Sequence, residues 1–197
     1  MIRVKSILAT LALAVSAAFA VSPAATAQGT KVVVIDRVQI FSQSQAGADI
    51  RTKIQAIETT MQGELKPLAD TLTADGASLR TKSEGKTQET VRADAALMSE
   101  IEAYSRKAND FERKRQIAAQ ELALTERKAL VDFNNALIPV LQQVIAENSA
   151  NVILDKSQVV YVDDATDVTQ SAITKLNAST PTVQVVRQSL PTQQPQQ

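Results

Sequence analysis

The chain has 197 residues, and its 21 basic and 21 acidic side chains give a formal net charge of zero at pH 7. This balance argues against a protein that coats nucleic acid, because such proteins neutralise phosphates with an excess of lysine and arginine. The sequence contains no cysteine and no histidine, so disulfides, thiolate nucleophiles and the commonest general base and metal ligands are missing. We therefore expect no enzyme, no cofactor and no metal site.

Residues 1–27 have the three parts of a secretory signal peptide. A positive start, with Arg3 and Lys5, precedes an apolar run and a small-residue cleavage site. A transmembrane anchor is the alternative, but it needs about 20 apolar residues, and this run is shorter and rich in alanine. We expect cleavage after Ala27, or alternatively after Ala20, and export of the mature chain to the periplasm.

A first strand is predicted at the start of the mature chain. Lys31–Ile35 is a continuous β-branched run, which is typical of a strand buried on both faces. Alternating character continues over Asp36–Phe41, so we expect extended chain there too, followed by a polar break at residues 42–47. Asp36 could be a catalytic acid, but a single carboxylate at a strand end more often has a structural or capping role.

Residues 47–148 predict two long helices folded back on each other as an antiparallel hairpin. Apolar residues recur at spacings of three and four in both halves, as in a heptad repeat, and a polar segment with a glycine, residues 82–87, separates them. At about 1.5 Å per residue the arms would reach roughly 55 to 90 Å, so they must project from a base. The stripe residues are Ile50, Ile54, Ile57, Met61, Leu65, Leu68, Leu72 and Leu79, then Ile101, Tyr104, Ala108, Phe111, Arg115, Ala118, Leu122, Thr125 and Ala129.

Several residues predict a weak and mobile arm. Pro67 and Pro139 should bend or break their helices, and Asp75-Gly76 should weaken the first helix near the tip. Many stripe residues are small, and Arg115 is charged, so the seam should bury little apolar surface.

Two groups of basic residues lie on the predicted arm, one near the tip and one in the second helix. They are candidates for contact with acidic client segments or, weakly, with an anionic membrane surface, although a solvated flank is the simpler explanation. The residues are Arg80, Lys82, Lys86 and Arg92 near the tip, and Arg106, Lys107, Arg113, Lys114 and Arg115 in the second helix.

The segment after the hairpin predicts two strands and a short helix. Residues 151–154 and 158–161 are apolar runs separated by three polar residues, which favours a β-hairpin. Asp167 is a candidate N-cap for a helix over residues 168–177. From residue 179 onward the chain is rich in proline, glutamine, threonine and serine, so we expect a disordered tail.

These elements predict an α+β fold, mostly α. A β-rich body (28–46 and 149–178) would carry the helical arm (47–148), followed by the tail (179–197). Three short strands leave open sheet edges, which are a liability unless several chains pool them into one closed body. We therefore expect an oligomer. The residues predicted to build its shared body are Val32, Val33, Val34, Ile35, Val152, Ile153, Leu154, Val159, Val160 and Tyr161.

Taken in this order, the pieces of the mature chain resemble the Skp (OmpH-like) family of periplasmic chaperones for outer-membrane proteins. The more specific matches are Val34–Phe41, Val152–Lys156, Val159–Tyr161 and Asp167–Thr169 with the helix that follows. The resemblance implies a homotrimer in which a small β-rich body carries three arms around a cavity. It also implies that unfolded β-barrel precursors are held there without ATP. The best-known member is strongly basic and this chain is not, so no lipopolysaccharide site is carried over.

Two other functions remain open from the residues. A structural coiled-coil adaptor of a cell-envelope complex would use the same hairpin, but it would need a straight, stiff arm and one fixed partner. An enzyme would have to rely on scattered carboxylates without a paired base or nucleophile. The heptad pattern does not tell which face of the arm would meet a client.

Overall fold

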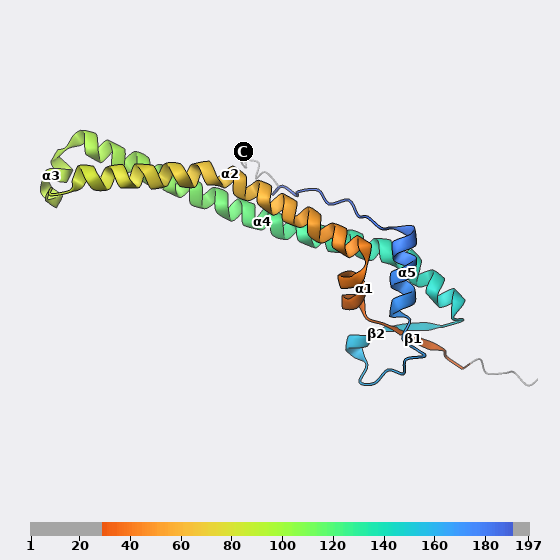
Figure 1. Ribbon diagram of the computed structural model, residues 1–197. Coiled ribbons are helices and arrows are strands. Elements are labelled where there is room, and N and C mark those ends of the chain that lie inside the picture. The colour runs from red at the N-terminus through yellow and green to blue at the C-terminus, as the bar shows by residue number, and fades with distance from the viewer. Residues whose placement is uncertain (1–28, 191–197) are drawn as a thin grey trace, which may run out of the picture.

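The computed structural model describes residues 29–190, so the predicted signal peptide and residues 191–197 lie outside the described part. The elements are β1 (Val32–Ile35), α1 (Arg37–Gln43), α2 (Gln45–Ser83), α3 (Gln88–Ala93), α4 (Ala95–Glu147), β2 (Val152–Asp155), a 3-10 turn η1 (Lys156–Gln158) and α5 (Thr169–Ser179). Helices α2 and α4 run side by side as a long arm with α3 at its tip. The two strands, α1 and α5 gather at the other end as a small body (Figure 1). The predicted α+β architecture, mostly α, is confirmed.

Helix α2 starts at a tight junction with α1. The hydroxyl of Ser44 accepts a hydrogen bond from the main-chain nitrogen of Gly47 at 3.1 Å, which caps the first turn. A Cβ atom on Gly47 would lie 1.8 Å from the carbonyl oxygen of Phe41. Glycine is therefore required at this position, because any side chain would collide with main-chain atoms.

The arm turns at Gly85, which adopts a positive φ of 74° that favours glycine. The second helix was expected to begin near Thr87 and to run on without interruption. Instead Thr87 caps the short helix α3, which ends before Asp94. Asp94 then caps α4, because its carboxylate accepts a hydrogen bond from the main-chain nitrogen of Leu97 at 3.1 Å. The polar capping residues at the tip explain this extra break.

The two prolines do not end their helices. Pro67 lies inside α2 and Pro139 inside α4, and α2 also continues through Asp75 and Gly76. A Cβ atom on Gly76 would lie 3.4 Å from the hydroxyl of Tyr104 on α4, so the two helices are packed closely there. Packing between α2 and α4 therefore holds the helices where local propensity alone would weaken them.

The sheet differs from the predicted hairpin. Strands β1 and β2 pair in parallel, from Val32 opposite Val152 to Ile35 opposite Asp155. The predicted strand at 158–161 is wrong, because the Asp155 carboxylate accepts hydrogen bonds from the nitrogen and hydroxyl of Ser157 and starts the 3-10 turn instead. On its other side β1 meets a single parallel bridge between Val34 and Asp167.

The prediction of extended chain at Asp36–Phe41 is also wrong, since α1 begins at Arg37. The Asp36 carboxylate accepts a hydrogen bond from the nitrogen of Gln39 at 2.8 Å, so Asp36 is the N-cap of this helix, and the capping role is confirmed. The helix buries Ile40 completely and leaves Val38 78% exposed. The alternation of apolar residues that suggested a strand also fits one helical turn.

The core lies in the body, where α1, α5, the sheet and the roots of α2 and α4 meet. Phe41 and Phe133 pack edge to face there, with ring centroids 5.0 Å apart and an interplanar angle of 87°. Within the described residues, α4 alone is long and apolar enough, by length and composition, to cross a membrane. Its root is instead packed in the body. Among the most deeply buried core residues are Ile35, Ile40, Val140, Val144, Ala172 and Leu176.

Residues 180–190, which we call the strap, differ from the disordered tail expected from their composition. They leave α5 and run extended along the arm (Figure 1). Val183 is only 7% exposed and belongs to the body core, and Val185 packs against it. Two β-branched apolar residues within a polar segment therefore fix the strap to the root of the arm.

Candidate functional site

The first candidate site is a hollow at the root of the arm, with a cavity volume of about 380 Å³. Its apolar lining comes from Phe41 on α1, Ile50 and Ile54 on α2, and Leu130 on α4. Leu130 is 47% exposed, so the hollow is open to solvent. Polar side chains surround it: Arg51, Gln55, Glu58 and Glu126.

Two interactions hold the wall of the hollow in place. The Phe41 ring is fixed against Phe133, and the Arg51 guanidinium lies 5.7 Å from the centroid of the Phe41 ring. The same guanidinium donates hydrogen bonds to the carbonyl oxygens of Phe41 at 3.2 Å and Ser42 at 3.1 Å. A rigid apolar wall with polar groups only at the rim suits an apolar side chain of a polypeptide better than a polar small molecule.

A second apolar surface follows α4 towards the tip. Ile117, Leu124, Val131 and Ile138 recur every seventh residue and therefore lie on one side of this helix. Ile117, Val131 and Ile138 are 38%, 49% and 52% exposed. This free stripe of α4 is not part of the seam with α2, where Thr125 and Ala129 are buried. It offers a long, shallow apolar surface to another chain.

The predicted basic groups are mostly neutralised by neighbouring carboxylates. Lys107 pairs with Asp75 at 2.6 Å, and Lys82 donates to Glu100 at 2.6 Å, so both pairs join α2 to α4 across the arm. Sequence reasoning could not find these pairs, because they depend on the register of the hairpin. The other predicted residues in ion pairs are Lys86 with Asp94, Arg106 with Glu102, Arg113 with Asp110, and Arg115 with Glu112.

This pairing weakens the case for a strongly cationic surface. The hydrogen bond from Lys86 lowers the pKa of the Asp94 carboxyl, and that from Arg115 lowers the pKa of Glu112. Both acids therefore stay ionised and matched to their partners at neutral pH. Within residues 29–190, the structure shows no ion pair for Arg80, Arg92 or Lys114, which leaves these three as the predicted cations available for a partner.

The residues predicted to form the shared body fall into two groups. Val33, Val34 and Ile35 are buried within the subunit itself, and Val32, Val152, Ile153 and Val159 are half-buried. In contrast Leu154, Val160 and Tyr161 are 37%, 105% and 80% exposed. Within the described residues β2 pairs only with β1, so its outer edge is open. These three residues and the β2 edge are the part of the predicted surface that remains free.

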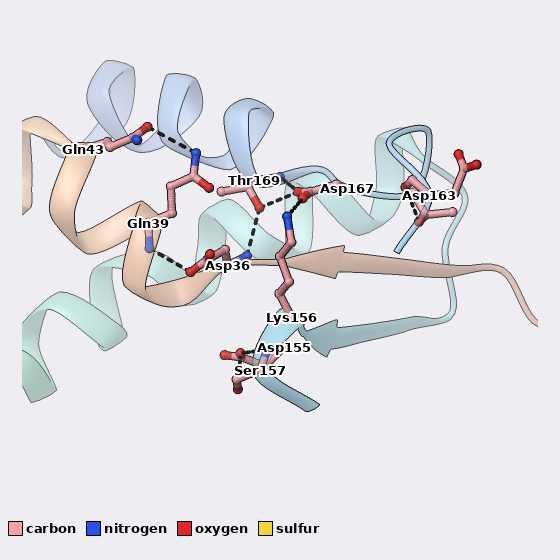
Figure 2. A network of polar contacts seen from close by, with 10 residues as sticks. Asp36, Gln39, Gln43, Asp155, Lys156, Ser157, Asp163, Asp167 and Thr169 are labelled. Atoms are coloured by element: carbon pink, nitrogen blue, oxygen red, sulfur yellow. Dashed lines mark hydrogen bonds and ion pairs between the residues drawn. The ribbon is translucent and has the colours of Figure 1, made fainter. Parts of the chain in front are cut away.

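Carboxylates also gather where the two strands end, as Figure 2 shows. The Asp167 carboxylate accepts hydrogen bonds from Lys156 at 2.8 Å and from the hydroxyl of Thr169 at 2.5 Å. That hydroxyl in turn accepts one from the main-chain nitrogen of Asp36 at 2.8 Å. Burial raises the pKa of Asp167, but the donors Lys156 and Thr169 outweigh it and lower the pKa overall. The network ties β1, β2 and α5 together, and its donors come from the protein itself.

Asp167 was predicted as the N-cap of the last helix, and the structure shifts this role slightly. Helix α5 starts at Thr169, and Val168 occupies the capping position. Asp167 still accepts a hydrogen bond from the nitrogen of Thr169 at 3.0 Å, so it holds the first turn from one residue further back. Ile173 and Leu176 on this helix are buried in the core.

Sequence reasoning missed the polar contacts between the strap and the arm. Arg187 of the strap pairs with Glu64 on α2 and with Glu121 on α4, each at 2.8 Å. The hydroxyl of Thr125 accepts a hydrogen bond from the main-chain nitrogen of Gln188 at 2.9 Å. The sequence feature that could have indicated these contacts is the run Val183–Arg187. It contains three valines and the single charged residue of an otherwise polar tail.

Comparisons with known proteins agree with this architecture. The family model for OmpH-like outer membrane proteins matches residues 31–176. Among solved structures, the chain is similar to an OmpH-like protein from Caulobacter crescentus that is described as a candidate outer membrane chaperone. The two are 25% identical, with a TM-score of 0.72, over 83% of this chain and 94% of that one. A comparison with curated proteins gave no match.

Proposed function

The chain belongs to the OmpH-like outer membrane protein family, and from this premise we propose that it is a periplasmic holdase chaperone. It binds unfolded outer-membrane β-barrel proteins between the arms of an oligomer and prevents their aggregation without ATP. The match over residues 31–176 agrees with the resemblance found in the motifs. The relative from Caulobacter crescentus supports the chaperone class, because its description names an outer membrane chaperone.

The observation that carries this proposal is the uncovered apolar surface of the arm. The hollow beside Phe41 and the free stripe of α4 present aliphatic and aromatic groups to solvent without a deep, closed cavity. Many shallow apolar contacts give weak, exchangeable binding, which suits a client that must later be released unfolded. A rigid receptor for one small molecule would instead have enclosed polar anchors.

Independence from ATP is supported by the sequence. A phosphate-binding loop of the P-loop type needs a glycine five residues before its Gly-Lys-Thr end. Gly85-Lys86-Thr87 matches only that end, because residue 80 is arginine, and the segment follows a helix rather than a strand.

The free edge of β2 supports assembly into a homotrimer. An open edge with Leu154, Val160 and Tyr161 beside it would be covered if the small sheets of three chains joined in one body. The arms would then surround a common space. The measurement is the molar mass of the purified mature chain by light scattering, and a monomer at micromolar concentration contradicts this part of the proposal.

A second candidate is a structural adaptor of the cell envelope, and one observation favours it. Helices α2 and α4 continue through Pro67 and Pro139, so the arm is less interrupted than the sequence suggested. A continuous two-helix arm can serve as a spacer between fixed partners. Such an adaptor would not protect an unfolded membrane protein, which separates it from the chaperone.

The decisive experiment is dilution of an unfolded outer-membrane β-barrel protein from urea into buffer without nucleotide, followed by light scattering. The mature chain is expected to suppress scattering at about one oligomer per client. Unchanged aggregation in the presence of folded, oligomeric protein would overturn the holdase function and favour the adaptor. Bovine serum albumin at equal mass serves as the control for unspecific protection.

A further inference from the structure

Part of the attachment of the strap to the arm uses the main chain of the strap. The main-chain nitrogen of Val183 donates to the Asp49 carboxylate at 3.0 Å, and Lys53 donates to the carbonyl oxygen of Val183 at 2.7 Å. Further along, the nitrogen of Gln188 donates to the hydroxyl of Thr125 at 2.9 Å. Any extended polypeptide carries these main-chain groups, so this part of the recognition does not depend on the sequence of the strap.

One side chain of the strap is recognised specifically. The Arg187 guanidinium donates to both oxygens of Glu64, at 2.8 and 3.0 Å, and to Glu121 at 2.8 and 2.9 Å. Hydrogen bonds to Glu64 and Glu121 raise the pKa of Arg187, so the cation is permanent. An arginine held between carboxylates of two helices makes a directional contact that lysine could not reproduce.

The arm residues beneath the strap are unusual for a helical seam. Glu121 is only 8% exposed and Thr125 only 1%, although the heptad pattern places apolar residues at this level of the arm. A carboxylate so far removed from water is costly unless a cation pairs with it. The strap supplies that cation, since Arg187 pairs with Glu121, and the main-chain nitrogen of Gln188 donates to the hydroxyl of Thr125.

The strap and the hollow occupy different sides of α2. The hollow is lined by Ile50, Ile54 and Glu58, which follow one another at spacings of four. The strap meets Asp49 and Lys53, which are also four apart but turned to another side of the helix. The arm thus has one side where apolar groups are open and another where a polypeptide is already bound.

We propose that Asp49, Lys53, Glu64, Glu121 and Thr125 form a binding site for an extended polypeptide that presents an arginine. The strap occupies this site in cis, and segments of unfolded clients displace it. The second part rests on the proposed chaperone function, because it assigns the clients of that function to the site. An occupant tethered to the same chain has a high effective concentration, so it lowers the apparent affinity for every competitor.

The test uses the full mature chain with Arg187→Glu, which sets a third carboxylate against Glu64 and Glu121 and opens the strap. Arg127→Glu is the matched control, since it makes the same charge change at an exposed position of α4 that takes no part in the hydrogen bonds of the strap. The probe is a fluorescein-labelled peptide of residues 180–190, and its binding is measured by fluorescence anisotropy. The peptide retains its own arginine, so it can fill the vacated site in trans.

We expect Arg187→Glu to bind the peptide at least tenfold more tightly than the wild-type chain and the Arg127→Glu control. Adding Glu64→Gln and Glu121→Gln to Arg187→Glu should abolish this gain. Equal binding by all chains, or binding that survives the two glutamines, overturns the site. Circular dichroism checks that each variant keeps the helical content of the wild type.

Competition then tests the clients. An unfolded β-barrel protein should release the bound peptide from Arg187→Glu, and this variant should suppress aggregation at a severalfold lower concentration than the wild type. If the wild type suppresses aggregation but the client never releases the peptide, the chaperone function stands and this inference falls. If the peptide binds as expected but no chain suppresses aggregation, the site exists but the chaperone function fails. The binding of clients to this site is then overturned as well.

Discussion

The carboxylate of Asp49 accepts a hydrogen bond from the main-chain nitrogen of Val183, a residue 134 positions further along the chain, at 3.0 Å. The same carboxylate pairs with Lys53 at 2.7 Å. One acidic side chain in the first turns of α2 therefore connects the strap to the arm. The hydrogen bond from Val183 is strong only while the Asp49 carboxylate is ionised, so the attachment of the strap depends on pH.

Acidification is predicted to loosen the strap. The hydrogen bond from Lys53 is the main cause that lowers the pKa of Asp49 below its usual value of 3.8. A lowered pKa in the folded chain means that this stabilisation is fully present above pH 3.8 and is lost as the pH falls through the folded value. The amide resonance of Val183 should then shift between pH 4 and lower values, as followed by nuclear magnetic resonance.

The control for this titration is Asp49→Asn, which cannot change its charge. In this variant the Val183 resonance should show little change over the same pH range. A shift of equal size in both chains would assign the effect to another group and contradict the role of Asp49.

Two glycines of α2 are predicted to respond in opposite ways to alanine. Gly47→Ala should lower the free energy of unfolding by more than about 2 kcal/mol, because its Cβ would collide with the carbonyl of Phe41. Gly63→Ala should raise it by about 0.5 to 1 kcal/mol, because no atom lies within 4 Å and alanine favours a helix. Urea denaturation at one fixed protein concentration measures both, and a Gly47→Ala variant as stable as the wild type would refute the close contact at Gly47.

The aromatic pair of the body is predicted to contribute strongly to stability. Phe133 is 3% exposed, so Phe133→Ala leaves a cavity and should cost about 3 to 5 kcal/mol of unfolding free energy. Leu130→Ala, three residues earlier and 47% exposed, should cost less than about 1 kcal/mol. Thermal unfolding monitored by circular dichroism compares the two, and similar losses would contradict the location of the core.

The hollow is predicted to contribute to client binding. Leu130→Ser removes an exposed apolar wall of the hollow, so more protein, by a factor of several, should be needed to suppress aggregation of an unfolded β-barrel protein. Val38→Ser is the matched control, because Val38 is an equally apolar residue, 78% exposed on α1 and outside the hollow. Equal activity of both variants would remove the hollow from the client-binding surface.

The long arm could be predicted from the sequence because its signal is local. Apolar residues at spacings of three and four identify a helix over any window of a few turns, and Gly85 marks the turn. The segment Asp36–Phe41 was harder to predict. Alternation of apolar and polar residues over only six positions fits a strand and a helical turn equally well. Only the cap formed by Asp36 and the packing of Ile40 decide it.

Contacts between distant residues could not be predicted in the same way. The parallel pairing of β1 with β2 joins two runs separated by the whole arm, and nothing within either run shows its direction. The pairing of the basic residues, such as Lys107 with Asp75, could not be predicted either, because it depends on the register of α2 against α4. The strap was missed because its composition is polar, while two valines and one arginine determine where it binds.

The position of β1 between β2 and the bridge at Asp167 also sets an order of folding. Strand β1 comes first among the described elements and has both neighbours in the last part of the chain, so it cannot pair before they are available. The arm can form earlier, because its two helices are joined by a short turn and close a local contact. We therefore expect a stage of folding in which the arm is formed while β1 is still unpaired and open to contact with other chains.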